Sequence, residues 1–202
     1  MTTSSLLPIE STEEKRLKSS GAEAQALLAR AERLLAPDEV GQAVRRVAGE
    51  ITAALGGQQP LLLTVMRGGV VFAGQLLPLL PFPLDFDYVD ATRYGDATRG
   101  GELDWRVDVP ATVRDRTVLV IDDILDEGRT LAAIRRRLLE AGAQRVLIAV
   151  FADKQLSRVK PVAADFAGVQ VPDRYVFGFG MDVHGWWRNL PAVYALRRDE
   201  QG

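Results

Sequence analysis

The chain has 202 residues, of which 47% are hydrophobic and 26% are charged, and its formal net charge is −2. This balance is typical of a globular protein with a buried core; it excludes disorder throughout the chain and gives no overall positive field for a polyanion such as nucleic acid. Cysteine is absent and His184 is the only histidine, so disulfides, thiolate metal sites, cysteine nucleophiles and histidine-rich metal sites are excluded.

The sequence contains no segment typical of export or membrane insertion. No apolar run reaches the roughly 18–20 residues that a transmembrane helix needs. Residues 1–16 lack the basic stretch followed by an apolar stretch that marks a secretory signal. We therefore expect a cytoplasmic protein without a membrane partner.

Apolar periodicity predicts helices that alternate with strands after a flexible N-terminal arm, residues 1–20. Helices are expected over residues 22–35, 38–55 and 70–80, and from about Arg129 to a cap at Gly142. Strands are expected over residues 61–66, 84–90, 117–121, 146–151, 175–177 and 193–196.

The segment over about residues 91–107 carries three glycines and little pattern. We expect a long mobile loop there and leave open a short strand at its end. Buried strands that alternate with helices favour an α/β architecture, in which a mostly parallel, twisted sheet carries helices on both faces. No second domain boundary is visible, so residues 21–202 are expected to form one domain.

The most informative segment is residues 118–130, VLVIDDILDEGRT. Its apolar run leads into Asp122 and Asp123, and ligands bind outside the carboxyl ends of the strands in an open parallel sheet. A helix N-terminus follows, whose unpaired backbone N–H groups favour an anion. Gly128 allows close approach to the backbone, and Thr130 offers a hydroxyl. The segment predicts acceptors for sugar hydroxyls beside a phosphate cradle, and it matches neither a Walker A loop nor a dinucleotide fingerprint.

This segment resembles the phosphoribosyl-pyrophosphate motif of the type I phosphoribosyltransferases. Four other stretches are similar to the hypoxanthine-guanine branch of that family: residues 63–69, 90–95, 151–154 and 171–182. The resemblance implies the type I phosphoribosyltransferase fold, with a small hood built from the terminal segments. It also implies a Mg²⁺-dependent purine salvage enzyme, which transfers the phosphoribosyl group from phosphoribosyl pyrophosphate to N9 of hypoxanthine or guanine and releases pyrophosphate.

The resemblance assigns the acidic segment to the ribose, the metal and the phosphate. It places Asp122 and Asp123 on the ribose hydroxyls and near Mg²⁺, adds Asp182 as a second metal ligand, and makes Asp126 the general acid/base at purine N7. Glu127 stands where the family usually has Thr or Ser. Because a carboxylate repels a phosphate, we expect this side chain to point away and to contribute only its N–H. The cradle for the 5′-phosphate is the backbone of Glu127, Gly128, Arg129 and Thr130.

Pyrophosphate contacts and a lid follow from the same resemblance. The pyrophosphate is assigned to Arg67, Gly68 and Arg188, with a non-proline cis peptide bond at Arg67. Arg93 and Tyr94 begin the mobile lid, where the family usually has Ser in place of Arg93.

The resemblance also assigns the purine contacts. Lys154 donates to the 6-oxo group, Tyr175 stacks on the base, and Val176 contacts the base edge through its backbone. His184 receives no role, because a single histidine is more often a packing or surface residue.

Two alternative functions stay open. One is a phosphoribosyltransferase that prefers xanthine, and the other is a non-catalytic regulatory protein of the same fold that senses phosphoribosyl pyrophosphate and binds RNA or DNA. The only arginine run, residues 135–137, lies on one predicted helix of a chain with net charge −2, which is weak support for nucleic-acid binding. We therefore expect small-molecule substrates as partners, no nucleic acid, and a homodimer or homotetramer.

Overall fold

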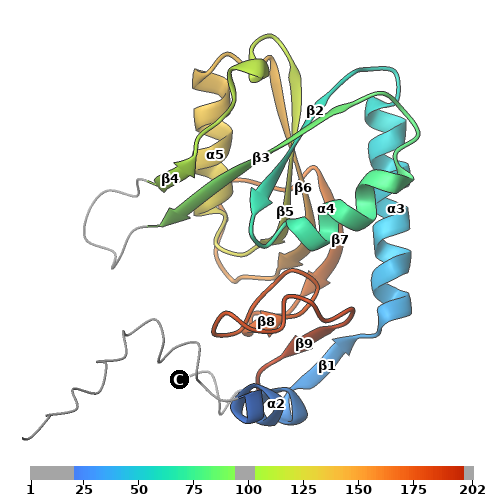
Figure 1. The fold of residues 1–202 in the computed structure, drawn as a ribbon, viewed down its shortest axis with the longest axis vertical. Coiled ribbons are helices and arrows are strands. Elements are labelled where there is room, and N and C mark those ends of the chain that lie inside the picture. Colours follow the sequence, from blue (N-terminus) through green and yellow to red (C-terminus); the bar gives the residue numbers. More distant parts are fainter. Residues whose placement is uncertain (1–20, 94–102, 198–202) are drawn as a thin grey trace, which may run out of the picture.

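The computed structural model describes residues 21–93 and 103–197 (Figure 1). The predicted N-terminal arm, Tyr94 and the middle of the predicted lid lie outside these residues. A six-stranded sheet of order β4-β3-β2-β5-β6-β7 forms the centre of this part of the chain. Its strands are β2 (Leu61–Met66), β3 (Asp85–Arg93), β4 (Leu103–Val107), β5 (Thr117–Leu125), β6 (Arg145–Lys154) and β7 (Phe166–Val171).

The sheet confirms the predicted α/β architecture. All neighbouring strands pair in parallel except β3 and β4, which are antiparallel. The predicted strand over residues 117–121 continues to Leu125. Asp122 and Asp123 therefore lie inside β5 and not after its end, because pairing with β6 persists to the partners Leu125 and Asp153.

Helices cover both faces of the sheet (Figure 1). α3 (Pro37–Leu55) and α4 (Val70–Leu76) pack on one face, and α5 (Arg129–Glu140) packs on the other. Alternate residues of each buried strand serve the two faces, as the pleat requires; Leu62 joins the α3 side and Leu63 the α5 side. The predicted helix over 70–80 ends at Leu76 and continues as a 3₁₀ turn (Leu77–Leu79), because Pro78 lacks the N–H that would extend it.

A second, three-stranded antiparallel sheet forms a hood beyond the C-terminal ends of the parallel strands (Figure 1). Its order is β1-β9-β8, and α2 (Gly21–Arg30) precedes it; the strands are β1 (Glu32–Leu35), β8 (Val176–Phe177) and β9 (Val193–Ala195). The hood is built from terminal segments, as predicted. The second half of the predicted helix over 22–35 is wrong, because those residues pair with β9.

The expectation for residues 91–107 needs correction at both described ends. β3 runs on to Arg93, and β4 occupies Leu103–Val107 and pairs with it. Both described ends of this segment are therefore strand and not loop, and the short strand considered at its end is present. No helix in residues 21–93 and 103–197 has the length and apolarity to cross a membrane.

Three phenylalanines join the hood to the main sheet. Phe151 of β6 lies with its ring centroid 5.9 Å from that of Phe72 on α4 and 4.3 Å from that of Phe179, which follows β8. All three rings are fully buried. Phe151 therefore links the helix layer, the sheet and the loop that enters the hood.

Replacing this central ring tests its contribution to stability. We expect Phe151→Ala to lower the free energy of unfolding by about 3–5 kcal/mol, because it removes buried aromatic area and leaves a cavity. Urea unfolding followed by circular dichroism measures the change. Val159→Ala, at a side chain that is 97% exposed, serves as the control and is expected to stay within about 0.5 kcal/mol of the parent chain. A similar small change for both variants would contradict the linking role of Phe151.

Candidate active site

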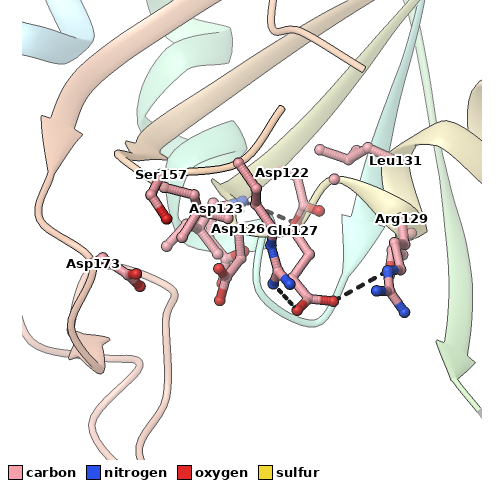
Figure 2. A pocket seen from close by; sticks show the side chains of 13 residues that line it. Asp122, Asp123, Asp126, Glu127, Arg129, Leu131, Ser157 and Asp173 are labelled. Atoms are coloured by element: carbon pink, nitrogen blue, oxygen red, sulfur yellow. Dashed lines mark hydrogen bonds and ion pairs between the residues drawn. The ribbon is translucent and has the colours of Figure 1, made fainter. Parts of the chain in front are cut away.

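A cavity of about 720 Å³ opens at the C-terminal end of β5 and the N-terminus of α5 (Figure 2). It gathers the whole of the predicted cradle with its acids: Asp122, Asp123, Asp126, Glu127, Gly128, Arg129 and Thr130. Gly128 has a φ of 78°, which favours glycine, and it turns the chain from the loop into α5. The cavity thus places a helix N-terminus, which attracts anions, beside the acidic end of β5.

Sequence reasoning missed several residues that line this cavity. Ser157 and Arg158 come from the loop between β6 and β7, and Asp173 follows β7. Figure 2 shows Asp173 and Ser157 on segments separate from the one that carries Asp126 and Glu127. The loop that carries Ser157 and Arg158 contains no motif, whereas Asp173 lies in the family-like stretch 171–182 without having been assigned a role. Leu131 and Leu156 also line the cavity.

A smaller cavity of about 200 Å³ adjoins the first and shares Asp123, Ile124 and Asp126 with it. Its remaining lining contains every residue assigned to the purine and one of the predicted metal ligands, together with Met181: Lys154, Tyr175, Val176, Met181 and Asp182. The fold therefore brings together groups from β5, β6 and the hood that lie far apart in the sequence, from Asp123 to Asp182.

The shared wall carries an ion pair. Lys154 Nζ donates to Asp126 Oδ2 at 2.7 Å, and the two side chains are 11% and 48% exposed. A cationic donor and an anionic acceptor thus lie side by side in the wall of the smaller cavity. Tyr175 is partly exposed beside them and stacks on His184, with ring centroids 6.5 Å apart. Partial burial, followed by the charge of Asp182, raises the pKa of the Tyr175 hydroxyl.

Asp122 and Asp123 are almost completely buried, at 8% exposure each. The backbone N–H of Asp123 donates to Asp122 Oδ1 at 2.9 Å. Burial raises the pKa of both carboxyls, and the neighbouring Asp123 raises that of Asp122 further. The pair is therefore a concentration of buried negative charge that a bound cation or hydroxyl donor would relieve.

Arg188 supplies part of that compensation from the hood. Its Nη1 lies 3.7 Å from Asp123 Oδ2, and its Nη2 lies 2.5 Å from Asp182 Oδ1. It also donates to the carbonyl of Gly180 at 2.6 Å. Within the described ranges 21–93 and 103–197, no group of three or more acids or histidines is close enough to hold a metal by itself. Asp122 and Asp123 instead offer a partial set of oxygen donors, which suits Mg²⁺ because it keeps waters and shares substrate phosphates.

The loop after β2 approaches the same acids closely. A Cβ at Gly68 would lie 2.1 Å from Asp123 Oδ2, so no larger residue fits there without a shift. The peptide bond between Met66 and Arg67 is cis, as expected, and Arg67 is exposed. Arg67 and Gly68 thus lie at the acidic end of β5, as their assignment to one site requires.

Glu127 has cationic partners at the cavity. Its carboxylate pairs with Arg129 Nε at 3.3 Å and with the guanidinium of Arg158 (Figure 2). The expectation that this side chain leaves the cradle to its backbone stays a prediction. The ion pairs give a reason for the side chain to remain at the rim, since both guanidiniums hold it there.

Arg93 ends β3, while Tyr94 lies outside the described residues, so the two lid residues remain predictions. His184 contacts the ring of Tyr175 and that of Trp186. Trp187 packs in the hood, where its Nε1–H donates to the carbonyl of Ala24 at 3.0 Å.

Comparison with known proteins gives consistent matches. Residues 30–184 match the phosphoribosyl transferase domain family. A hypoxanthine-guanine phosphoribosyltransferase of Bacillus subtilis is 31% identical over 165 residues, which are 81% of this chain and 92% of that protein. A bifunctional protein TilS/HprT of Listeria innocua is 34% identical over 165 residues, again 81% of this chain, but the chain spans only 26% of its length. A crystal structure of a hypoxanthine phosphoribosyltransferase from Staphylococcus aureus matches with a TM-score of 0.75 and 26% identity, covering 83% of this chain and 93% of that one.

The buried acid pair predicts a pH-dependent stability. A carboxyl whose pKa rises on folding destabilises the native state above its unfolded pKa, so stability falls as pH rises from about 4 through the raised value. We expect Asp122→Asn, measured by urea unfolding with a chelator present, to be more stable than the parent chain at pH 7. The gain should shrink toward about pH 4. Asp104→Asn, at an exposed position of β4, should show no such gain; a loss of stability in Asp122→Asn at pH 7 would contradict the argument.

Proposed function

The chain belongs to the phosphoribosyl transferase domain family, and from this membership we propose that it is a purine salvage enzyme. It transfers the 5-phosphoribosyl group of phosphoribosyl pyrophosphate to N9 of hypoxanthine or guanine, which gives the nucleoside monophosphate and pyrophosphate. The observation that carries this proposal is the pair of adjoining cavities, one suited to a sugar phosphate and one to a base, with Asp126 in the wall between them.

The larger cavity would hold the phosphoribosyl group. The backbone N–H groups of residues 127–130 at the start of α5 would bind the 5′-phosphate, since the helix N-terminus carries partial positive charge. Asp122 and Asp123 would accept hydrogen bonds from the ribose hydroxyls. Their oxygens, together with that of Asp182, would be the protein's donors to Mg²⁺. When bound, the metal would neutralise charge on the diphosphate.

The departing pyrophosphate would lie between β2 and the hood. The loop of Arg67 and Gly68 reaches the acidic end of β5, and Arg188 reaches it from the hood. Arg188 contacts both Asp123 and Asp182. Its guanidinium therefore lies beside the acids at which the diphosphate and its metal would bind. Arg67 and Arg188 would stabilise the charge that develops as the bond to the ribose breaks.

The smaller cavity would select the base through the Lys154–Asp126 pair. The edge of a 6-oxopurine presents a carbonyl acceptor next to the N7 position. Lys154 Nζ would donate to that carbonyl, and the Asp126 carboxylate would accept the proton at N7 as N9 attacks the ribose. Tyr175 would stack on the ring, and the backbone of Val176 would contact its edge. Adenine places an amino donor against the Lys154 ammonium, so the pair disfavours it.

The arginine run gives little support to the alternative of a nucleic-acid-binding sensor. Arg137 pairs with Asp108, and Arg136 pairs with Glu140 at 3.7 Å. Acidic partners thus offset two of the three charges in that run, which weakens it as a contact for a phosphate backbone. A homodimer or homotetramer and a cytoplasmic location stay part of the proposal.

Pyrophosphate release tests the proposed function directly. The chain is incubated with phosphoribosyl pyrophosphate and Mg²⁺, with hypoxanthine, guanine, xanthine or adenine in separate wells, and wells with a chelator serve as controls. We expect release with hypoxanthine and guanine, none with adenine, and loss of release with the chelator. Release with xanthine above the others would assign the xanthine preference. Silence in every well, from folded protein that still binds phosphoribosyl pyrophosphate, would favour the sensor.

The role of Asp126 predicts a separation of turnover from binding. We expect Asp126→Asn to lower kcat by at least about a hundredfold, the scale of a lost general acid/base, with the KM for phosphoribosyl pyrophosphate largely kept. An asparagine can still accept the Lys154 hydrogen bond, so the fold should be unaffected. Asp38→Asn, at an exposed position in the first turn of α3, is the matched control. Turnover like that of the parent chain in Asp126→Asn would exclude the assigned role.

A further inference from the structure

Lys160 lies in the loop between β6 and β7 and ties two strand ends together. Its Nζ donates to the backbone carbonyl of Leu125 at 2.7 Å and to Asp153 Oδ1 at 2.5 Å. The side chain of Lys160 is only 13% exposed. Leu125 on β5 and Asp153 on β6 are register partners in the parallel sheet. One ammonium group therefore holds both members of the last register pair between these strands.

The residue that follows each of these two in the chain belongs to the proposed reaction centre. Asp126 follows Leu125, and Lys154 follows Asp153, and these two side chains form their own ion pair at 2.7 Å. Lys160 thus holds the backbone carbonyl of the residue before Asp126 and the side-chain carboxylate of the residue before Lys154. Neither cavity includes Lys160 in its lining, so it does not need to touch a substrate to affect their positions.

The residues after Lys160 reach the phosphate cradle. A Cβ at Gly128 would meet Val162 Cγ1 at 3.3 Å and Pro161 Cδ at 3.4 Å. The segment 160–162 therefore packs against the turn into α5 while Lys160 holds the strand ends. It connects the backbone of the cradle with the backbone of the base pocket.

The Lys160 ammonium is nearly buried, so it depends on its two acceptors to compensate for the water it has lost. Loss of one member of a desolvated ion pair leaves the other charge uncompensated, so the Lys160–Asp153 pair favours a single arrangement of the loop. Geometry matters for turnover, because a misplacement of about 1 Å from a residue away from the chemistry can cost roughly a hundredfold in rate.

We propose that Lys160 is a positioning residue that sets the separation of Asp126 and Lys154 by holding Leu125 and Asp153. The inference rests on the proposed function for its kinetic consequence. It makes no use of a contact between Lys160 and a substrate. Sequence analysis gave no indication of it, since Lys160 stands in a loop without a motif.

Three variants test the proposal: Lys160→Met, Lys160→Arg and Asp153→Asn. Methionine keeps the length of the stem but removes both hydrogen bonds and the charge, whereas arginine keeps a charged donor. Arg145→Met removes an exposed cation from the opposite end of β6 and is the matched control. We expect Lys160→Met to lower kcat with hypoxanthine by on the order of tenfold to a hundredfold, with a smaller change in the KM for phosphoribosyl pyrophosphate. Lys160→Arg should restore most of kcat, and Asp153→Asn should fall between them.

Amide hydrogen exchange supplies a readout that does not need activity. We expect faster exchange at residues 124–127 and 153–155 in Lys160→Met than in the parent chain. In Arg145→Met the exchange rates of these residues should match those of the parent chain. Unchanged exchange and unchanged kcat in folded Lys160→Met would overturn the proposal. So would a fall in kcat that Lys160→Arg does not reverse. If Lys160→Met fails to fold, Asp153→Asn answers the same two questions. An inactive parent chain whose strand ends still loosen in Lys160→Met would refute the proposed function and leave the positioning role intact.

Discussion

The parallel pairing of β5 with β6 places the central groups of the candidate site. Because the pairing continues to Leu125 and Asp153, it carries Asp122 and Asp123 into the sheet as buried residues. It also brings Asp126 and Lys154 beside each other as the strands end. Had β5 ended at Ile121, the two acids would be solvated loop residues. Their raised pKa values, and their capacity to draw in a cation, follow from this extension.

The site buries two carboxyl groups that do not stabilise the fold. Two carboxyls almost without exposure carry a desolvation cost that Arg188 offsets only in part, at 3.7 Å from Asp123. Perturbed groups of this kind cluster at functional sites, where a ligand supplies the missing partner. The hood and the loop after β2 also pack tightly at the site. A Cβ at Gly180 would overlap the carbonyl of Gly68, and a Cβ at Gly68 would overlap the carboxylate of Asp123. The hood therefore contributes to the site by bringing Arg188 and Asp182 to the sheet.

Local sequence predicted those parts of the molecule that local interactions determine. The strands over residues 61–66 and 146–151 are continuous apolar runs in a buried sheet, and the periodicity of α3 matches its buried face. The second half of the helix expected over 22–35 failed because β1 is stabilised by pairing with β9, which lies more than 150 residues away. β7 escaped notice because it is an edge strand with mixed burial.

The acidic segment of the site could be predicted from the sequence because residues 118–130 are contiguous. The residues that join it from other parts of the chain could not be predicted in this way. Arg158 reaches the cavity and Lys160 reaches the strand ends from a loop whose course depends on tertiary packing and whose local sequence carries no motif. Asp173 lies in the family-like stretch 171–182, but its place in the cavity wall was not predicted. Glu127 shows how a partner from a distant loop changes the electrostatic effect of a side chain. Alone, its carboxylate beside a phosphate cradle is repulsive. Between Arg129 and Arg158 it belongs to a group of two cations and one anion, so this group keeps a net positive charge. Exposed pairs of this kind are weak and are screened by salt, so the guanidiniums remain able to turn toward an incoming phosphate.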